Sequence, residues 1–302
     1  MSRATGLGLY GRTATRAAAP VIREYSTSFG LATRMFARRC RPAIATIYAL
    51  VRVADEIVDG TAAEAGLDAA TQRELLDAFE AETERAVATG FSANLVVHAF
   101  AEVARACGIE LELTRAFFAS MRRDLDPVAF DEEEYRRYVH GSAEVVGLMC
   151  LRVFLAGRPV SAETAAVLEE GASRLGAAFQ KVNFLRDVAH DRGALERSYL
   201  PELREAGLTE EGVAAVAADI RSDLDAARAA IPLLPADCRR PVALATAFFA
   251  ELLRRIERLP AAQLATTRVS VPAPVKLALA LRHGALLPGA LQPRLPFEPR
   301  HA

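Results

Sequence analysis

Long apolar runs, clustered cysteines and an excess of one charge are all missing from this sequence of 302 residues. A membrane-spanning helix needs roughly 18 to 20 uninterrupted apolar residues, but even the apolar window Val145–Leu155 contains Gly147 and Arg152. The four cysteines, at positions 40, 107, 150 and 238, show no Cys-x-x-Cys spacing, which argues against a zinc site and a dense disulfide framework. The net charge of −1 gives no reason to expect a nucleic-acid partner. We therefore expect a cytoplasmic protein with at most peripheral membrane contact.

The sequence also lacks strand-like alternation, internal repeats of fixed length and a glycine-rich dinucleotide loop. Helical periodicity runs through most of the chain instead, and 52% of the residues are apolar, which is enough for a large core. The prediction is an all-α fold, organised as a single-domain bundle of about ten or more helices. The expected helices span residues 42–59, 71–88, 92–106, 111–125, 132–140, 143–156, 162–191, 209–230, 240–259 and 274–283.

The two ends of the chain differ in composition from the rest. Residues 1–20 contain three arginines and no acidic residue, and we predict a flexible tail there, although an organellar transit peptide has the same composition. Residues 286–302 are rich in proline and are predicted to form a second tail. The folded domain is therefore expected over residues 21–285, with a polar loop at 61–68 after Gly60.

Two stretches of the sequence place polar side chains along one face of a helix that is apolar elsewhere. At about 100° per residue, the polar residues of each stretch fall within an arc of roughly 60° or little more. The first stripe consists of Tyr48, Arg52, Asp55 and Asp59. The second stripe consists of Gln180, Asn183, Asp187 and Asp191. Because a helix that is apolar on most sides is normally buried, we expect both stripes to face the inside of the bundle.

The carboxylates of the two stripes indicate a metal-diphosphate chemistry. Two such pairs facing each other would concentrate negative charge inside an apolar wall, which is unfavourable without compensation. Magnesium would compensate this charge, because it takes oxygen ligands from one or two carboxylates and completes its shell with waters and substrate phosphates. Arg52, Lys181 and Arg186 would then contact phosphate oxygens. The pattern predicts the loss of a diphosphate leaving group.

Loss of diphosphate from an apolar substrate leaves a carbocation, which must be shielded from water. An apolar pocket would provide this shielding, and its aromatic faces would stabilise positive charge. The expected pocket residues are Phe29, Leu148, Phe154, Phe179 and Phe184.

A purely structural interpretation of the same residues stays open. Asp55 and Asp59 could form the solvated last turn of an amphipathic helix, paired with Arg52 for a few tenths of a kcal/mol. Tyr138 could be a core aromatic residue with a bonded hydroxyl, and Ser26 and Ser28 could cap helices. His190 points away from the second stripe and is expected to be a solvated side chain.

Together the motifs resemble the phytoene/squalene synthase family, over roughly residues 25–256. The resemblance rests on Ser26-Thr27-Ser28-Phe29, on Tyr48-x-x-x-Arg52-x-x-Asp55-Glu56-x-x-Asp59, on Tyr138-Val139-x-Gly141-x-x-x-Val146-Gly147, and on Gln180-x-x-Asn183-x-x-Arg186-Asp187-x-x-x-Asp191 followed by Tyr199-Leu200-Pro201. It implies an isoprenoid synthase fold whose central cavity receives two allylic prenyl diphosphates. The sequence departs from the family pattern at His190, where an acidic residue often stands, and at Phe249, which occupies a tyrosine position.

The resemblance also implies roles for individual residues. The positions that match the family's magnesium ligands are Asp55, Asp59, Asn183, Asp187 and Asp191, which would hold two or three Mg²⁺ ions together with the substrate diphosphate. The positions that match substrate contacts are Ser26, Ser28, Arg52, Gln180 and Arg186. The catalytic positions in the cavity are Tyr48, Arg52, Tyr138 and Tyr199.

The activity implied by the resemblance is head-to-head condensation of two prenyl diphosphates through a cyclopropylcarbinyl diphosphate. The sequence shows neither a dinucleotide loop nor a C-terminal membrane helix, so we expect a phytoene-type enzyme of carotenoid biosynthesis that uses geranylgeranyl diphosphate and no NADPH. Three alternatives stay open: squalene-type synthesis from farnesyl diphosphate, prenyl transfer to an aromatic acceptor, and an assembly factor without catalysis.

Overall fold

The computed structural model describes residues 6–126, 130–187, 200, 203 and 207–284, without the side chains of residues 27–29. Every regular element in these residues is a helix, which confirms the predicted all-α bundle. The helices are α1 (Gly6–Tyr25), α2 (Thr27–Met35), α3 (Arg41–Val58), α4 (Thr61–Glu64), α5 (Ala69–Thr89), α6 (Leu95–Cys107), α7 (Leu111–Asp124), α8 (Glu132–Val139), the π-helical turn η1 (His140–Glu144), α9 (Val145–Leu155), α10 (Ala162–Asp187), α12 (Glu210–Ala230), the 3₁₀ turn η2 (Ile231–Leu233), α13 (Ala236–Ile256), α14 (Ala261–Leu264) and α15 (Ala273–Arg282).

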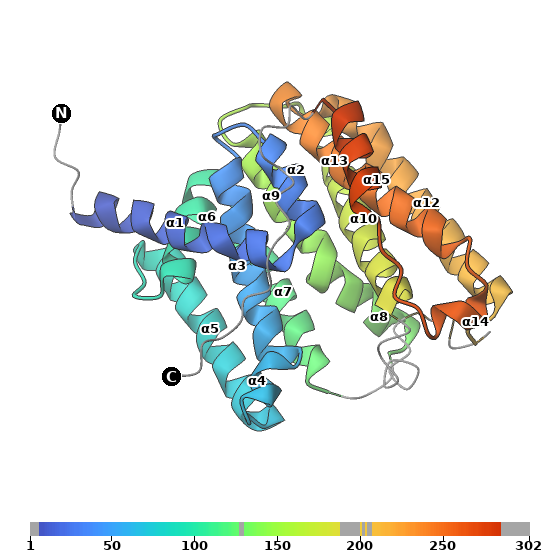
Figure 1. The fold of residues 1–302 in the computed structure, drawn as a ribbon. Helices are drawn as coiled ribbons and strands as arrows, with labels where there is room; N and C mark the ends of the chain where they lie inside the picture. The colour runs from blue at the N-terminus through green and yellow to red at the C-terminus, as the bar shows by residue number, and fades with distance from the viewer. Residues whose placement is uncertain (1–5, 127–129, 188–199, 201–202, 204–206, 285–302) are drawn as a thin grey trace.

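The helices form two groups with the α7–α9 segment between them (Figure 1). The blue and cyan helices α1, α3, α5 and α6 lie on one side, and the yellow to red helices α10, α12, α13 and α15 lie on the other. Each group contributes most of one hydrophobic core, the first around Leu50, Phe100 and Phe117 and the second around Leu185, Ile220 and Ile256. The space between the two cores is therefore where a cavity can remain.

The prediction of a flexible tail over residues 1–20 is wrong for residues 6–20, which belong to α1. This helix lies across α3 and α6 (Figure 1) and buries Gly11, Ala14, Ala18 and Ile22 against them. These residues repeat every three to four positions, opposite the exposed Arg12 and Arg16, so the helix is amphipathic even though its buried residues are small. Their small size allows close packing: a Cβ atom at Gly11 would lie 2.2 Å from the Glu102 carboxylate. The predicted tail at 286–302 lies outside the described residues.

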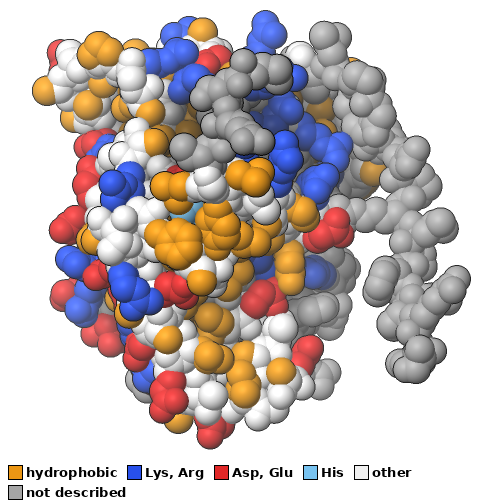
Figure 2. Space-filling view, turned by 90° about the vertical axis from the view of Figure 1, so that its left-hand side faces the viewer, with side chains coloured by type: hydrophobic (Ala, Val, Ile, Leu, Met, Phe, Trp, Pro, Cys, Tyr) orange, Lys and Arg blue, Asp and Glu red, His pale blue; other side chains and the backbone are white. Residues whose placement is uncertain are grey.

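The face of the molecule that carries α1 is shown in Figure 2, where apolar side chains gather near the centre among charged ones. Leu7 and Leu9 of α1 and Phe91 of the segment before α6 are among the exposed large apolar residues. The Phe91 ring lies 5.4 Å from that of Tyr10, and the Tyr10 hydroxyl donates to the carbonyl of Ser92 at 3.0 Å. These contacts fix α1 to the segment that precedes α6.

Local sequence signals set the two ends of helix α3, which carries the first stripe. Pro42 lies in its first turn, where a missing N–H leaves no hydrogen bond unmade. The helix ends at Val58, and Gly60 follows with φ of 101°, a conformation that favours glycine. The predicted polar loop at 61–68 is wrong at its start, because residues 61–64 form the short helix α4.

Helices α8 and α9 are joined by η1 into one continuous helical segment. Its 24 residues, Glu132–Leu155, are long and apolar enough to cross a membrane by composition alone. This segment packs against α7 and α10, and 44% of its most apolar window is buried inside the fold. Such burial is typical of a core helix, so its apolar composition has an explanation within the fold.

Candidate active site

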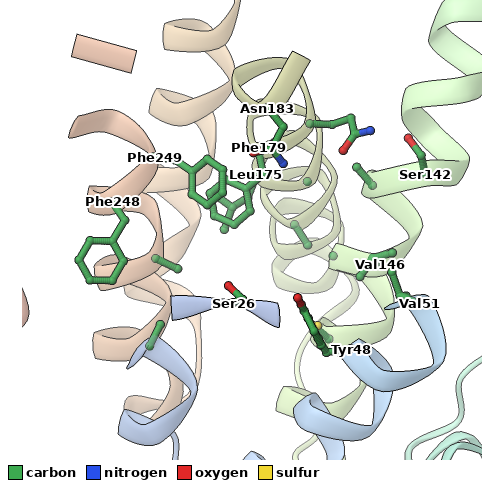
Figure 3. A pocket seen from close by; sticks show the side chains of 18 of the residues that line it. Ser26, Tyr48, Val51, Ser142, Val146, Leu175, Phe179, Asn183, Phe248 and Phe249 are labelled. Atoms are coloured by element: carbon green, nitrogen blue, oxygen red, sulfur yellow. The ribbon is translucent and has the colours of Figure 1, made fainter. Parts of the chain in front are cut away.

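A cavity of about 960 Å³ lies between the two groups of helices. Its walls come from α2, α3, α7 to α10, α12, α13 and the segment 268–276. Figure 3 shows Tyr48 and Val51 of α3, Val146 of α9 and Asn183 of α10 around this space. The volume is near the upper end of the range of about 300–1,000 Å³ typical of ligand pockets. The cavity therefore has room for a large ligand.

The cavity wall changes from polar to apolar along each of its main helices. On α3, the lining residues run from Ile44 and Ile47 to Asp55 and Asp59. On the antiparallel segment α8–α9, every fourth residue lines the cavity, from the polar end to the apolar end: Tyr138, Ser142, Val146, Cys150 and Phe154. Because α10 shows the same gradient from Leu168 to Asp187, the cavity has one polar end and one apolar end.

The first stripe lines the polar end of the cavity, and its arginine, Arg52, is shared by two carboxylates. The Arg52 guanidinium binds the Glu56 carboxylate through Nε at 2.6 Å, and its Nη1 lies 3.9 Å from Asp55 Oδ2. Burial raises the pKa of Asp55 to about 7; Arg52 opposes this shift, whereas Asp124 and Asp59 add to it. The site therefore has too little positive charge to hold Asp55 fully ionised at neutral pH.

The second stripe lines the opposite wall and has an arginine partner that the sequence did not predict. Arg186 Nε donates to Asp187 Oδ1 at 2.9 Å, and Arg268 Nε donates to the same oxygen at 3.1 Å. Arg268 lies 81 positions after Asp187, in an irregular segment whose sequence carries no periodic signal. Lys276 of α15 also lines the cavity, and burial lowers the pKa of its ammonium group. Arg186, Arg268 and Lys276 therefore place three cationic side chains on the described part of this wall.

Tyr48 and Tyr138 of the cavity wall are held by specific partners. The Tyr138 hydroxyl donates to Asp124 Oδ1 at 2.7 Å, and Asp124, the last residue of α7, is a cavity residue that the sequence analysis missed. Burial raises the pKa of Tyr48, while Arg52 and a hydrogen bond with Ser26 oppose the shift. Ser26 and Tyr48 are both seen in Figure 3. These contacts orient both phenol groups within the cavity wall.

Most of the predicted site residues line this one cavity. They are Ser26, Tyr48, Arg52, Asp55, Asp59, Tyr138, Gln180, Asn183, Arg186 and Asp187. Asp191, Tyr199 and His190 lie outside the described residues, as do the side chains of Ser28 and Phe29. The chemical roles assigned to all these residues stay predictions.

One predicted phosphate contact is wrong. The ammonium group of Lys181 binds Asp223 Oδ2 at 2.7 Å and also pairs with Asp219. Both carboxylates belong to α12, and Lys181 is not among the cavity residues. Lys181 follows Gln180 by one position, which rotates its side chain by about 100° away from the stripe. It holds α10 and α12 together instead.

The apolar end of the cavity is lined by aromatic rings from α9, α10, α13 and the residue that follows α2. The rings of Phe36 and Phe154 stack with centroids 5.2 Å apart, and those of Phe179 and Phe249 stack at 3.8 Å (Figure 3). Phe154, Phe179 and Phe184 line the cavity as predicted, whereas Leu148 does not. Stacked rings leave no hydrogen-bonding group on this surface, so it can shield a hydrocarbon from water.

Close helix packing gives the cavity wall its shape. A Cβ atom at Gly147 would lie 2.4 Å from the carbonyl oxygen of Ala172, and one at Gly176 would lie 2.5 Å from that of Ala143. The α8–α9 segment and α10 therefore meet backbone to backbone, which only glycine permits at these two positions.

The residues at the polar end fit magnesium together with a diphosphate. Among the described residues, no three His, Cys, Asp or Glu side chains lie close enough to hold one metal ion. Magnesium needs only one or two protein carboxylates when phosphates and waters complete its shell, and Asp55, Asp59 and Asp187 supply such oxygens from two walls. The site is therefore suited to a metal that arrives with its phosphate ligand.

Three comparisons with known proteins agree with this geometry. The family model described as "Squalene/phytoene synthase" matches residues 22–274. Phytoene synthase 3 of Zea mays is 34% identical over 198 residues, which are 64% of this chain and 44% of that protein. Phytoene synthase 1 of Solanum lycopersicum is 33% identical over 198 residues, which are 64% of this chain and 46% of that protein. The chain thus spans less than half the length of these two relatives.

Two solved structures share the fold. A dehydrosqualene synthase crystallised with a ligand has a TM-score of 0.74 and 21% identity, covering 92% of this chain and 97% of that chain. A squalene synthase from Alicyclobacillus acidocaldarius has a TM-score of 0.69 and 22% identity, covering 83% of this chain and 95% of that chain. The helical bundle is therefore a fold that these proteins have in common.

Proposed function

We propose that this chain, which belongs to the squalene/phytoene synthase family, condenses two allylic prenyl diphosphates head-to-head in the cavity between α3 and α10. The observation that carries the proposal is the polarity of the cavity. Carboxylates and arginines from both stripes gather at one end, and stacked aromatic rings lie at the other. An allylic prenyl diphosphate has the same division between a charged head and an apolar chain.

The polar end is built to receive the diphosphate group. Arg52, Arg186 and Arg268 are paired with carboxylates, so a diphosphate would compete for guanidinium groups that are already positioned. Asp55, Asp59, Asn183 and Asp187 would hold Mg²⁺. When bound, this ion supplies positive charge that stabilises the leaving diphosphate.

The remaining cavity residues would control the cation that forms when diphosphate leaves. The aromatic faces of Phe184 and Tyr138 line the space next to the polar end and would stabilise positive charge without supplying a nucleophile. The allylic cation would then add to the double bond of the second substrate and give a cyclopropylcarbinyl diphosphate. The buried Tyr138–Asp124 hydrogen bond keeps this phenol oriented during both ionisations.

Proton loss after the second ionisation would give a phytoene-type product. The curated relatives are named phytoene synthases, which supports geranylgeranyl diphosphate as the substrate and a reaction without NADPH. The large cavity and its apolar end agree with long prenyl chains. Squalene-type synthesis and transfer to an aromatic acceptor are alternative outcomes of the test below.

The test is product analysis with defined substrates. The purified protein is incubated with labelled geranylgeranyl or farnesyl diphosphate and Mg²⁺, with and without NADPH, and hydrocarbons are identified by mass spectrometry. We expect a C40 triene from geranylgeranyl diphosphate that does not depend on NADPH. The Asp55→Asn variant should lose this activity, whereas Asp225→Asn, which removes an exposed carboxylate on α12, should keep it. A label that never enters a C30 or C40 hydrocarbon under any condition would refute the proposal.

A further inference from the structure

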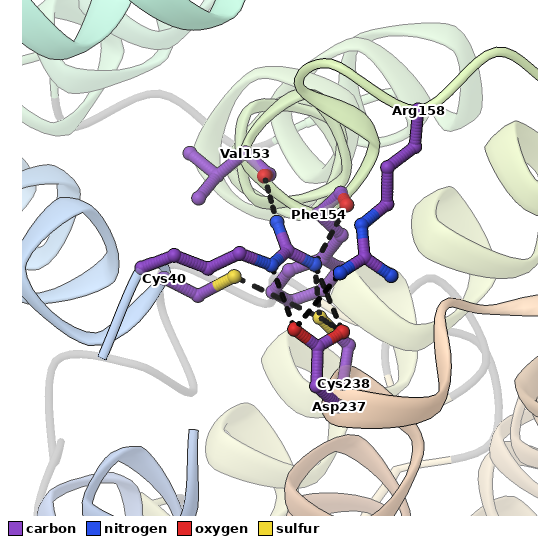
Figure 4. Close-up of polar contacts among 7 residues, drawn as sticks. Cys40, Val153, Phe154, Arg158, Asp237 and Cys238 are labelled. Atoms are coloured by element: carbon purple, nitrogen blue, oxygen red, sulfur yellow. Dashed lines mark hydrogen bonds and ion pairs between the residues drawn. The ribbon is translucent and has the colours of Figure 1, made fainter. Parts of the chain in front are cut away.

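Two thiols from distant parts of the chain meet behind the cavity wall (Figure 4). Cys40 and Cys238 are 198 positions apart, and their Sγ atoms lie 3.8 Å from each other. Cys40 is the N-cap of α3, and Cys238 lies in the first turn of α13. A disulfide has an S–S length of about 2.05 Å. The two sulfur atoms therefore need to approach by less than about 2 Å to form a bond.

Charged side chains cover the two thiols on the solvent side. Arg39 donates to both carboxylate oxygens of Asp237, at 2.7 and 2.9 Å, and its Nη2 lies 3.5 Å from Cys238 Sγ. Arg158 also binds Asp237, at 3.3 Å. Both thiols are 0% exposed, but the side chains of Arg39 and Asp237 are 32% and 27% exposed. One layer of side chains therefore separates the thiols from water.

The surroundings make the two sulfur atoms chemically different. The hydrogen bond with Cys238 lowers the pKa of the Cys40 thiol; burial opposes this shift, and the Arg39 charge adds to it. The same contact and burial raise the pKa of Cys238. Both thiols lie at helix N-termini, Cys40 at the N-cap of α3 and Cys238 in the first turn of α13, a position that stabilises a thiolate. Either thiol can donate the hydrogen bond between them, and the lowered pKa of Cys40 makes it the thiol that we assign to the first step.

The other two cysteines lack such surroundings. Burial raises the pKa of Cys150 to about 12, and it also raises that of Cys107. No arginine hydrogen bond comparable to that of Arg39 is found at either thiol in the described part of the chain. They therefore serve as internal controls.

We propose that Cys40 and Cys238 are a redox modification site that closes to a disulfide with hydrogen peroxide. The Cys40 thiolate attacks one peroxide oxygen, the O–O bond breaks, and the departing hydroxide takes up a proton to leave as water. The resulting Cys40 sulfenic acid is attacked by the Cys238 sulfur. The S–S bond forms, the S–O bond breaks, and the second hydroxide leaves as water with the Cys238 proton. The thiols lose two electrons and the peroxide gains them, and an added dithiol reverses the reaction.

The bond would fix two walls of the cavity relative to each other. Helix α3 carries the first stripe, and Pro241 and Val242 of α13 line the cavity directly after Cys238. The disulfide would also close a loop of 198 residues, which restricts the unfolded chain more than a short loop does. We expect the oxidised protein to melt roughly 5–10 °C higher than the reduced one.

The test begins with the unmodified full-length protein. After peroxide treatment and removal of the oxidant, the number of thiols that react in denaturant should fall from four to two, and return to four with a dithiol. Peptide mapping without reductant should identify a Cys40–Cys238 linked peptide. This measurement does not depend on the catalytic activity, so it stands apart from the proposed function.

Variants then test the specificity of the pair. Cys107→Ser and Cys150→Ser should keep both the linked peptide and the rise in melting temperature, whereas Cys40→Ser and Cys238→Ser should lose both. Arg39→Gln should slow the loss of thiols at least severalfold, because the pair loses the guanidinium that lies 3.5 Å from Cys238 Sγ and whose charge lowers the pKa of Cys40. Four unchanged thiols in the wild type, sulfinic acid without a linked peptide, or a link through Cys107 or Cys150 would each overturn the proposal.

Discussion

Replacing Asp55 by asparagine should stabilise the metal-free protein while abolishing its activity. Asp55 lies near two other acids, Asp59 and Asp124, whose negative charges raise its pKa. The arginine beside it, Arg52, binds Glu56 more closely than Asp55. Burial is the largest cause of the raised pKa, which reaches about 7. The ionised carboxylate is therefore less stable in the folded protein than in the unfolded chain, and an amide removes this penalty.

The sign and size of the effect follow from the pKa. Between the ordinary value of 3.8 and about 7, the folded protein binds a proton more tightly than the unfolded chain, so stability falls as the pH rises through this window. A shift of that size corresponds to at most about 4 kcal/mol. Because 32% of the Asp55 side chain is exposed, solvent screening reduces the effect. We expect the variant to gain about 1–2 kcal/mol over the wild type at pH 8 and less at pH 5.

Urea unfolding at pH 5 and pH 8 without metal measures this difference. Asp237→Asn is the matched control of opposite sign, because a hydrogen bond from Arg39 lowers the pKa of Asp237 to about 2. The Asp237 contribution is present above its ordinary pKa of 3.8 and is lost as the pH falls through about 2, so the control variant should be less stable than the wild type at both pH values. Added Mg²⁺ and inorganic diphosphate should stabilise the wild type but not Asp55→Asn. An Asp55→Asn variant that is less stable than the wild type at pH 8 without metal would refute the reasoning.

Two further predictions concern the shape of the cavity. Gly176→Ala should lower the free energy of unfolding by about 1–3 kcal/mol, because its Cβ would lie 2.5 Å from the carbonyl oxygen of Ala143, whereas Gly30→Ala, with its nearest contact at 3.4 Å, should not lower it in the same urea assay. Phe154→Ala removes one ring of the stack with Phe36 at the apolar end and should raise kcat/KM for longer relative to shorter prenyl diphosphates; an unchanged ratio would show that substrate chains do not reach this end.

The long helices could be predicted from the sequence because their apolar residues recur at helical spacing over many turns. The expected helix at 71–88 is α5 at Ala69–Thr89, and the one at 209–230 is α12 at Glu210–Ala230. The apolar spacing identified the helices, but it places their ends only to within a residue or two. The ends are set by capping side chains: at the start of α5, the Asp68 carboxylate accepts a hydrogen bond from the N–H of Thr71.

Helix α1 was not predicted, although its small buried residues recur at helical spacing, and much of its stability comes from its neighbours. Its buried face is made of glycine and alanine apart from Ile22, and such a face gains little by leaving water on its own. The helix becomes favourable only where α3 and α6 offer a surface that small residues can approach closely. Contacts of this kind join residues far apart in the chain, so no local sequence window contains them.

The candidate site was predictable to the extent that one helix carries several of its residues. Helical periodicity places Asp55 and Asp59 on one side of the first predicted helix, and Asn183 and Asp187 on one side of α10. This placement does not depend on the tertiary structure. Asp124 and Arg268 lie on other segments, and only the tertiary structure brings them to the cavity. Their sequences show no pattern that distinguishes them from solvated side chains.

The carboxylates on the two sides of α10, Asp55 of α3 on the cavity side and Asp223 of α12 on the other, show how charge balance separates a structural carboxylate from a functional one. Behind the cavity wall, Asp223 is 0% exposed and binds both Arg174 at 3.0 Å and Lys181 at 2.7 Å, so its charge is matched by two cations within the protein. Inside the cavity, Asp55 has one arginine 3.9 Å away and further acids nearby. A buried carboxylate without sufficient compensation destabilises the fold. A cation that enters with its ligand would remove this deficit, which is why we assign the metal and the diphosphate to the cavity face and a structural role to the other face.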